Sequence, residues 1–464
     1  MDFEHSANWP KLGDQTAQIS IRMSTVSAET PQSLECRGSG GIEMHLRQLL
    51  VWTLALSPSL AFGAGNCIFA SAPPSELAAA TRMPPLPPRS LKVVLYPALP
   101  NFPDYKKWIV TEFEKRNPDI RLEVIDLTNN YYGPFVDDFV GCAQADVYEL
   151  DSVFLYDFAI NGKIQALPDS VKEPRDVFLG NAVKGVQVGG VQFGEPHWVC
   201  GNFFFFKTSD TNLRSLPSLD DLRLRIGKTP VPGGGIAVDL KGKSTLGEFY
   251  LNAAVDRYHD WNVVKEHIAA FDHDIEKDLI AIRDMCEESS CRDSSKHGTS
   301  FFAEEFDAKK ARALIGYSES LNGALKWAAD PTKCPVKDSC LHDEDIEVEE
   351  LPLDPAGSRT MSWVDSFTID SKCKATYLSD AAAFIHFMNE DNTYMSILLD
   401  RSGVPAYLLP AKASLYSKRE LLTRAHLYPE LRAIIENSVV PSDLGLNESL
   451  RNTGRVLDAD LSKP

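Results

Sequence analysis

Hydrophobic and polar positions alternate in two ways from residue 90 onward, and the two patterns follow each other along the chain. LKVVLYPAL at residues 91–99 and IRLEVIDL at residues 120–127 are short apolar runs typical of strands. Between them, YKKWIVTEFEKRNP at residues 105–118 has the period of an amphipathic helix that ends at Pro118. A strand, a helix and a second strand in this order predict a right-handed βαβ unit on a parallel sheet, and hence the α/β class.

A further change from strand to helix is predicted within ADVYELDSVFLYDFAING. ADVYEL forms the strand, and the chain turns at Asp151 and Ser152 into a helix that begins with a capping residue. In open α/β sheets, ligands bind outside the carboxyl ends of the strands. Tyr96, the two tyrosines of NNYYG (Tyr131 and Tyr132) and Asp151 all fall at such ends.

PGGGIAVDLKGKST at residues 232–245 is rich in glycine, which raises the question of a phosphate-binding loop. Ala237 stands where that motif requires its first glycine, so the tight turn is not specified. We therefore predict an ordinary loop that leads into the N-terminus of a helix.

Composition narrows the class of partner. The chain has 464 residues, 44% hydrophobic and 24% charged, which is a globular composition with room for roughly two to four domain-sized cores. Lys and Arg total 47 against 65 Asp and Glu, so the formal net charge is −18. This balance disfavours nucleic acid and suits a cationic or neutral ligand.

The first 90 residues differ from the rest. Residues 1–43 form a polar extension without pattern, and residues 44–64 have the layout of a signal peptide, with Arg47, an apolar run and small residues. The run is too short to span a membrane as a stable helix. A proline-rich linker at residues 65–90 follows. We expect a secreted protein with no membrane contact after cleavage; an apolar core helix in an extension is the alternative, and the true start, Met1 or Met44, stays open.

Seven cysteines remain after the linker, which fits an oxidising compartment. Four of them form close pairs, Cys286 with Cys291 and Cys334 with Cys340, and we predict disulfides there. A zinc site at Cys334, Cys340 and His342 is the alternative, but this spacing matches none of the usual ligand sets.

Six short motifs occur in one colinear order over about residues 91–420, and together they resemble the thiaminase I (thiamine pyridinylase) family. The motifs are LKVVLYPALP, ELDSVFL, FGEPHWVCGNFFFFKTSD, ALIGYSES, WVDSF and YLLPAKASLY. The resemblance implies a type II periplasmic-binding-protein-like fold, with two α/β lobes around a ligand cleft. We expect residues 91–200 and about 355–400 in one lobe, and residues 201–354 and about 401–464 in the other. The N-terminal extension and the cysteine-containing insertions depart from the family.

The resemblance also implies roles for individual residues. Cys200 matches the nucleophile, and Glu319 in GYSES matches the general base. Carboxylates that hold the substrate match Asp151 and Asp365. Among the aromatic residues of the pocket, Tyr96 is the best match in the first strand, while Tyr131 and Tyr132 compete for one position. The reaction implied is cleavage of thiamine without a metal or an organic cofactor, with an amine or a thiol as the second substrate.

These residue types suit that chemistry. A thiol with a pKa of about 8.5 is mostly protonated at neutral pH, so a nucleophilic cysteine needs a base, and Glu319 can serve as one. Thiamine carries a permanent thiazolium charge joined to an aminopyrimidine, so its pocket requires aromatic faces and carboxylates. The tyrosines and Asp151 supply both.

Each residue also has a simpler interpretation. A lone cysteine beside FFFF is usually a buried hydrophobic residue, Asp151 alone is a helix cap, and an isolated Glu319 is a surface carboxylate. A protease dyad of His197 and Cys200 is disfavoured, because residues three apart on a strand point to opposite faces. A secreted solute-binding protein for thiamine or its pyrimidine, without catalysis, is the competing function. The oligomeric state stays open, with a monomer as the working expectation.

Overall fold

The residues that the computed structural model describes belong to one compact unit of the protein. The described residues are 88–127, 130–132, 134–227, 234–241, 243–286, 291, 299–336, 340–353, 359–399 and 403–462. They all lie in the unit Leu77–Pro464, which is distinct from the unit Met1–Glu76. The predicted N-terminal extension, the signal peptide and nearly all of the linker lie outside the described residues.

The first sheet is mixed, and its strands follow the order β13-β7-β12-β3-β1-β2, with β4 paired to β12. The strands are β1 (Arg89–Val94), β2 (Ile120–Ile125), β3 (Val147–Asp151), β4 (Ile164–Gln165), β7 (Gly194–Cys200), β12 (Trp363–Asp370) and β13 (Leu409–Pro410). β1 is parallel to β2 and to β3, whereas β12 is antiparallel to β3 and to β7. The predicted α/β class and the first strand-helix-strand unit are therefore confirmed.

The second sheet has four strands in the order β11-β8-β10-β9, and a separate pair consists of β5 (Gln187–Val188) and β6 (Val191–Gln192). The four strands are β8 (Asn202–Lys207), β9 (Ile236–Val238), β10 (Ala313–Tyr317) and β11 (Ile346–Glu349). The prediction of a loop at residues 232–245 was incomplete, because Ile236–Val238 forms β9, parallel to β10. All three residues of β9 are buried, so their apolar side chains outweigh the glycines before them.

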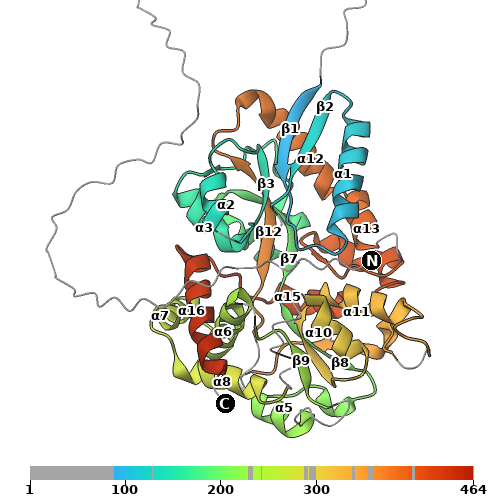
Figure 1. Ribbon diagram of the computed structural model, residues 1–464. Coiled ribbons are helices and arrows are strands. Elements are labelled where there is room, and N and C mark those ends of the chain that lie inside the picture. Colours follow the sequence, from blue (N-terminus) through green and yellow to red (C-terminus); the bar gives the residue numbers. More distant parts are fainter. Residues whose placement is uncertain are drawn as a thin grey trace, which may run out of the picture. The chain divides into compact units, whose positions relative to one another are not determined.

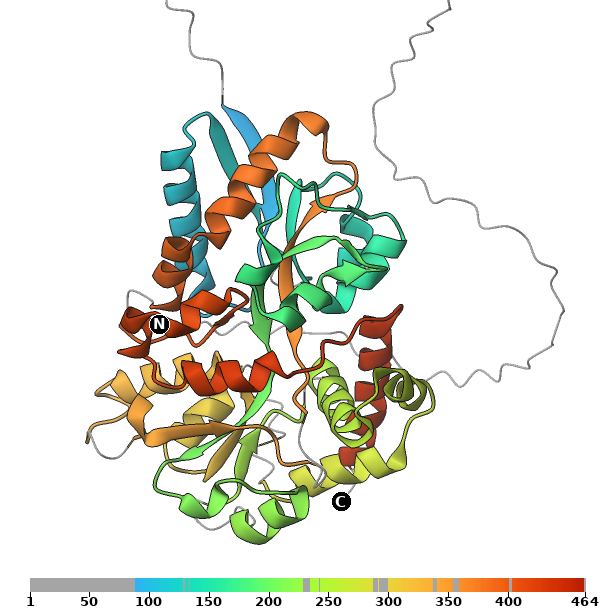
Figure 2. The same ribbon diagram turned by 180° about the vertical axis from the view of Figure 1, so that it is seen from behind.

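The helices surround the two sheets (Figures 1 and 2). They are α1 (Phe102–Arg116), α2 (Pro134–Phe139), α3 (Ser152–Ile160), α4 (Gly180–Gly185), α5 (Leu219–Ile226), α6 (Lys243–Tyr258), α7 (Trp261–Ala269), α8 (His273–Arg283), α10 (Thr299–Asp307), α11 (Ser320–Ala329), α12 (Leu378–Asn389), α13 (Asp391–Leu398), α14 (Arg419–Leu422), α15 (Tyr428–Glu436) and α16 (Leu446–Leu461). Among the described residues, no helix is long and apolar enough to cross a membrane.

The chain passes from the first sheet to the second at a single residue. Cys200 ends β7, Gly201 follows, and Asn202 begins β8. A Cβ atom on Gly201 would lie 2.8 Å from the carbonyl oxygen of Met361, which belongs to the segment that enters β12. Only glycine allows this close approach, so the two crossing segments touch each other beside Cys200. Figure 1 shows β7 and β12 between the two groups of strands and helices.

The C-terminal helix α16 connects parts of the chain that lie far apart in sequence. It packs along α6 and also contacts α3, α7 and α8 (Figures 1 and 2). Gly247 of α6 faces the backbone of Leu450, and a side chain there would overlap the Leu450 carbonyl. Arg451 of α16 donates a hydrogen bond to the carbonyl oxygen of Tyr132. α16 therefore holds α6 in place next to a loop that carries predicted site residues.

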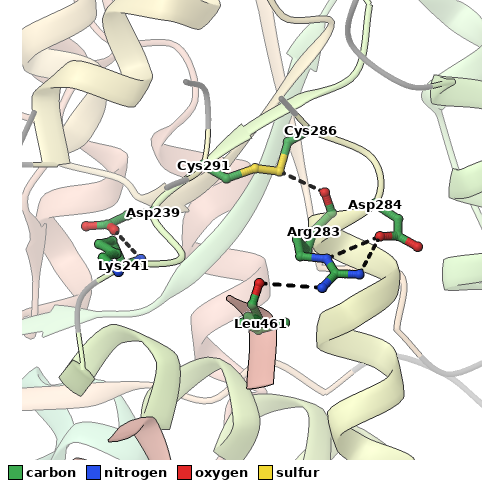
Figure 3. Close-up of a disulfide and its surroundings, with 7 residues drawn as sticks. All are labelled: Asp239, Lys241, Arg283, Asp284, Cys286, Cys291 and Leu461. Atoms are coloured by element: carbon green, nitrogen blue, oxygen red, sulfur yellow. Dashed lines mark hydrogen bonds and ion pairs between the residues drawn. A yellow bond between two sulfur atoms is a disulfide. The ribbon is translucent and has the colours of Figure 1, made fainter. Parts of the chain in front are cut away.

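Both predicted disulfides are present, Cys286 with Cys291 and Cys334 with Cys340. The first lies just beyond the end of α8, where Arg283 donates hydrogen bonds to Asp284 and to the carbonyl of Leu461 in α16 (Figure 3). The carbonyl of Cys291 accepts a hydrogen bond of 2.9 Å from the Leu240 N–H. This disulfide therefore links α8 to the segment between β9 and α6.

Candidate active site

Cys200 lies at the point where the chain leaves the first sheet. It pairs with Trp363, the first residue of β12, and its side chain is half-buried. It takes part in no disulfide. The residue is therefore a thiol at a strand end next to the two crossing segments.

Asp151 and Asp365 stand directly opposite each other on β3 and β12. Asp151 caps α3, and its Oδ1 accepts a hydrogen bond of 2.9 Å from the Val153 N–H. Asp365 is 1% exposed, and its Oδ1 has no hydrogen-bond partner among the described residues. Burial raises the pKa of Asp151 to about 6, and burial together with Asp151 raises the pKa of Asp365 well above its usual value. Two facing buried carboxyl groups resist double ionisation, so the pair retains a proton until a cation approaches.

The three predicted tyrosines gather around this pair, but they do not have the same environment. The Tyr132 hydroxyl donates to Asp151 Oδ2 at 2.9 Å and lies 3.2 Å from the Tyr96 hydroxyl. The Tyr131 hydroxyl instead donates to the Glu149 carbonyl at 2.9 Å and accepts from the Asp151 N–H at 2.8 Å. The Tyr96 ring is edge-on to both other rings, at centroid distances of 5.4 Å and 6.5 Å. Tyr131 thus supports the backbone, whereas Tyr96 and Tyr132 are half-buried beside a carboxylate.

Glu319 lies two residues beyond the end of β10 and immediately before α11. The turn is fixed because the Ser318 hydroxyl donates to the Tyr407 carbonyl at 2.7 Å. Burial raises the pKa of Glu319 to about 7. A carboxylate with a pKa near neutrality is well matched to accept a proton from a thiol.

Two neighbouring residues escaped the sequence analysis. Glu248, in the middle of α6, contacts the Tyr317 hydroxyl, and its pKa is raised well above the usual value by burial, by Asp151 and by Glu319. Tyr317 belongs to the same GYSES motif as Glu319. The signal for Glu248 was a single carboxylate inside the apolar run LGEFYL, where a surface glutamate is out of place.

The thiol and the carboxylates form one electrostatic cluster. Burial raises the pKa of Cys200 well above its usual value, and the charged groups that raise it most are, in order, Asp365, Asp151, Glu319 and Glu248. The structure therefore brings together the predicted cysteine and all three predicted carboxylates, and adds a fourth. Because these charges oppose a thiolate, the cluster suits a cationic ligand whose charge offsets them.

A buried pair supports the cluster from within the first sheet. Glu149 and His197 are fully buried, with His197 Nδ1 2.5 Å from Glu149 Oε1. The other oxygen of Glu149 accepts a hydrogen bond of 2.9 Å from the Tyr96 N–H. Pro97, which has no N–H, follows directly, and the strand predicted to reach residue 99 ends at Val94. His197 is thus engaged with Glu149, and the pair fixes the backbone of Tyr96.

Among the residues that the structure describes, no group of three or more His, Cys, Asp or Glu side chains is arranged to hold a metal ion.

The two sheets with their crossing segments define an α/β protein of the type II periplasmic-binding-protein-like class, as the comparisons with solved structures bear out. Maltose-bound MalE3 of T. maritima aligns with a TM-score of 0.59 and 16% identity, over 80% of this chain and 94% of that chain. No protein-family model matches the sequence.

Within this class, the chain is similar to thiaminase I proteins in both sequence and fold. Thiaminase-1 of Paenibacillus thiaminolyticus is 23% identical over 357 residues, which cover 75% of this chain and 81% of the relative. Clostridium botulinum thiaminase I in complex with thiamin aligns with a TM-score of 0.68 and 21% identity, over 80% of this chain and 100% of that chain. At these identities the likeness to the solved structures shows the fold.

Proposed function

We propose that the protein cleaves thiamine by displacing its thiazole with an amine or a thiol, as a thiamine pyridinylase. The observation that carries this proposal is the position of the Cys200 thiol among four carboxylates and two half-buried tyrosines, where a chain of thiaminase I-like fold crosses between its two sheets. Thiamine is a cation with an aromatic ring, so it satisfies both the excess negative charge and the aromatic side chains.

Thiamine itself activates the thiol in this proposal. Without ligand, burial and, after it, the carboxylates hold the pKa of Cys200 high, and the thiol stays protonated. The bound thiazolium offsets these charges, which lowers the cost of forming the thiolate. Glu319, with a pKa of about 7, then accepts the thiol proton.

The transfer proceeds in two displacements that balance. The Cys200 thiolate adds to the pyrimidine ring, and the thiazole leaves from the methylene with the electron pair of the C–N bond. The nucleophile then attacks the methylene, and the electrons that return to the ring expel the thiolate. A nucleophile with an N–H or S–H bond releases that proton as the new bond forms. Cys200 recovers its proton from Glu319, so the enzyme ends as it began.

A binding protein without catalysis is the second candidate. The high pKa of Cys200 favours it, because a thiol that stays protonated with ligand bound would act as part of the pocket wall. Asp151, Asp365, Tyr96 and Tyr132 can hold a cationic aromatic ligand with no covalent step.

We also propose that the protein is exported. Support comes from the layout of residues 44–64 and from the two disulfides, which persist in oxidising compartments. N-terminal sequencing of secreted protein should find a start well after Met44. An intact residue 1 on intracellular protein would contradict export.

The deciding experiment measures free thiazole after purified protein is incubated with thiamine and pyridine or aniline. Cys200→Ser keeps the size of the side chain but replaces an ionisable thiol with a hydroxyl that Glu319 cannot readily deprotonate. Thiazole release should fall by orders of magnitude, while thiamine affinity should change little. If Cys200→Ser cleaves thiamine as fast as wild type, the assignment of Cys200 as the nucleophile is wrong. If wild type binds thiamine tightly but releases no thiazole with any acceptor, the protein is a receptor.

A further inference from the structure

The reaction outlined above leaves one buried carboxylate without a task. The charges of Glu248 and Glu319 both raise the pKa of the Cys200 thiol, and the charge of Glu319 also raises the pKa of Glu248. They come from different elements, α6 and the start of α11, and Tyr317 connects them because it contacts Glu248 and lies two residues before Glu319. The second sheet therefore presents two carboxylates to the same thiol.

A small cavity is lined by Tyr317, which contacts Glu248, and by residues close in the chain to Cys200, Glu248 and Glu319. Its lining includes Asn202, two residues after Cys200; Thr245 and Phe249, close to Glu248 in α6; and Tyr317 and Ser320 on either side of Glu319. Asn202 stands directly opposite Tyr317 in the sheet. Its side chain is 2% exposed, and its Oδ1 has no hydrogen-bond partner among the described residues. A buried acceptor of this kind calls for an N–H or O–H donor from a ligand or a water molecule.

The reaction releases two protons, one from Cys200 and one from the nucleophile, so two proton acceptors are useful. Glu319 takes the proton of Cys200 when the thiol adds to the ring, and it keeps that proton until the thiolate is expelled. The nucleophile attacks during this interval. An amine or a thiol must then lose a proton of its own, and Glu319 is already protonated.

We propose that Glu248 accepts the proton that an amine or thiol nucleophile releases as it attacks, while Glu319 serves Cys200. This inference rests on the proposed function. The nitrogen or sulfur lone pair forms the new bond to the methylene, the ring electrons expel the Cys200 thiolate, and the nucleophile's proton moves to Glu248. The positive charge brought in by thiamine leaves as that proton, which Glu248 releases to solvent.

The surroundings of Glu248 suit this role. Burial raises the pKa of Glu248 well above its usual value, and the neighbouring Asp151 and Glu319 raise it further. Glu319 carries no charge once it holds the Cys200 proton, and the loss of that charge favours the ionised form of Glu248, which is the form that can accept a proton. The Tyr317 hydroxyl donates to one oxygen of the Glu248 carboxylate, and in this role the other oxygen accepts the proton of the nucleophile.

A comparison of two nucleophiles tests whether Glu248 serves the nucleophile and Glu319 serves Cys200. Pyridine has no proton to lose and gives a pyridinium product, whereas aniline must lose one. For Glu248→Gln, the ratio of the aniline rate to the pyridine rate should fall by about 100-fold relative to wild type, since a positioned base typically contributes at least that much. Tyr317→Phe should lower the same ratio less, because it removes only the contact that holds Glu248. For Glu319→Gln the ratio should stay near the wild-type value, because the thiol needs its base whichever nucleophile follows.

Each result decides the question. The pyridine rate of Glu248→Gln reports in the same sample whether the variant folds and binds thiamine. A ratio that stays at the wild-type value, whether both rates fall or neither does, would overturn the role of Glu248. Wild-type protein that releases thiazole with neither nucleophile would overturn the proposed function, and the present inference with it. Wild-type activity combined with an unchanged ratio overturns the present inference alone.

Discussion

The two sheets build their parts of the site in different ways. On the first sheet, Asp151 and Asp365 are direct neighbours in the pairing of β3 with β12, so the backbone register sets their separation. Beside the second sheet, Glu319 stands at the start of α11 and Glu248 lies within α6. Their placement depends on how helices pack, and the Tyr317 contact joins them.

This difference suggests a difference in task. A carboxylate pair on adjacent strands is rigid and shares one proton, which suits the recognition of a ligand with a permanent positive charge. Carboxylates at the start of a helix and on a helix face, each with a raised pKa, suit the transfer of protons. We therefore expect substitutions in the first group to change binding most, and those in the second group to change turnover most.

The largest effect should come from Glu319→Gln. Turnover with pyridine should fall by roughly 10²- to 10⁴-fold, because the thiol loses its base, while the thiamine dissociation constant should change far less. Steady-state kinetics together with calorimetry would measure both quantities. A variant that loses affinity and keeps its turnover at saturation would reverse the comparison.

Asp365→Asn should instead change the affinity for thiamine. Thiamine affinity should weaken by roughly 10- to 100-fold, since a charge-assisted contact contributes about 1.5–3 kcal/mol. Turnover at saturating thiamine should change less than in Glu319→Gln. Calorimetric titration of both variants against thiamine provides the measurement, and equal affinities for the two would contradict the distinction.

Lowering the pH should weaken thiamine binding, because it protonates Asp151. The pKa of Asp151 in the free protein is about 6, raised by burial from 3.8, so the carboxyl is mostly protonated below that pH. A cation binds the ionised form, so the dissociation constant of thiamine should rise as pH falls through 6, by about tenfold per pH unit at the limit. The slope is measured by titration from pH 7.5 to 4.5. Asp151→Asn should flatten it, and an equally steep slope in that variant would show that another group titrates.

The smallest expected effect on thiamine affinity comes from Tyr132, and it distinguishes Tyr132 from the adjacent Tyr131. Tyr132→Phe removes a hydrogen bond to Asp151 and should weaken thiamine binding by a factor of roughly 2 to 10, with little change in the melting temperature. Tyr131→Phe is the matched control, because it leaves the Asp151 N–H without its acceptor. It should lower the free energy of unfolding by about 1–3 kcal/mol. Equal effects of both changes on affinity would show that the two rings form one unit.

Much of the first half of the fold could be predicted from sequence. The βαβ unit was visible because strand and helix periods differ, and the cap at Asp151 was visible because capping residues are few. The strand β9 was missed, since three residues are too short for a period to show and glycines precede them. Glu248 was missed because its place in the cluster depends on the contact between α6 and Tyr317 of β10, which the sequence does not give.

The sequence by itself determined the α/β class and the two disulfide pairings. These follow from local spacing, because strand and helix periods and short cysteine loops depend on near neighbours in the chain. Tertiary structure alone decided that Asp151 faces Asp365, that Tyr132 rather than Tyr131 turns toward that pair, and that Glu248 joins Glu319. Such contacts link residues far apart in sequence, and the raised pKa values arise only when burial removes water from several carboxyl groups at once.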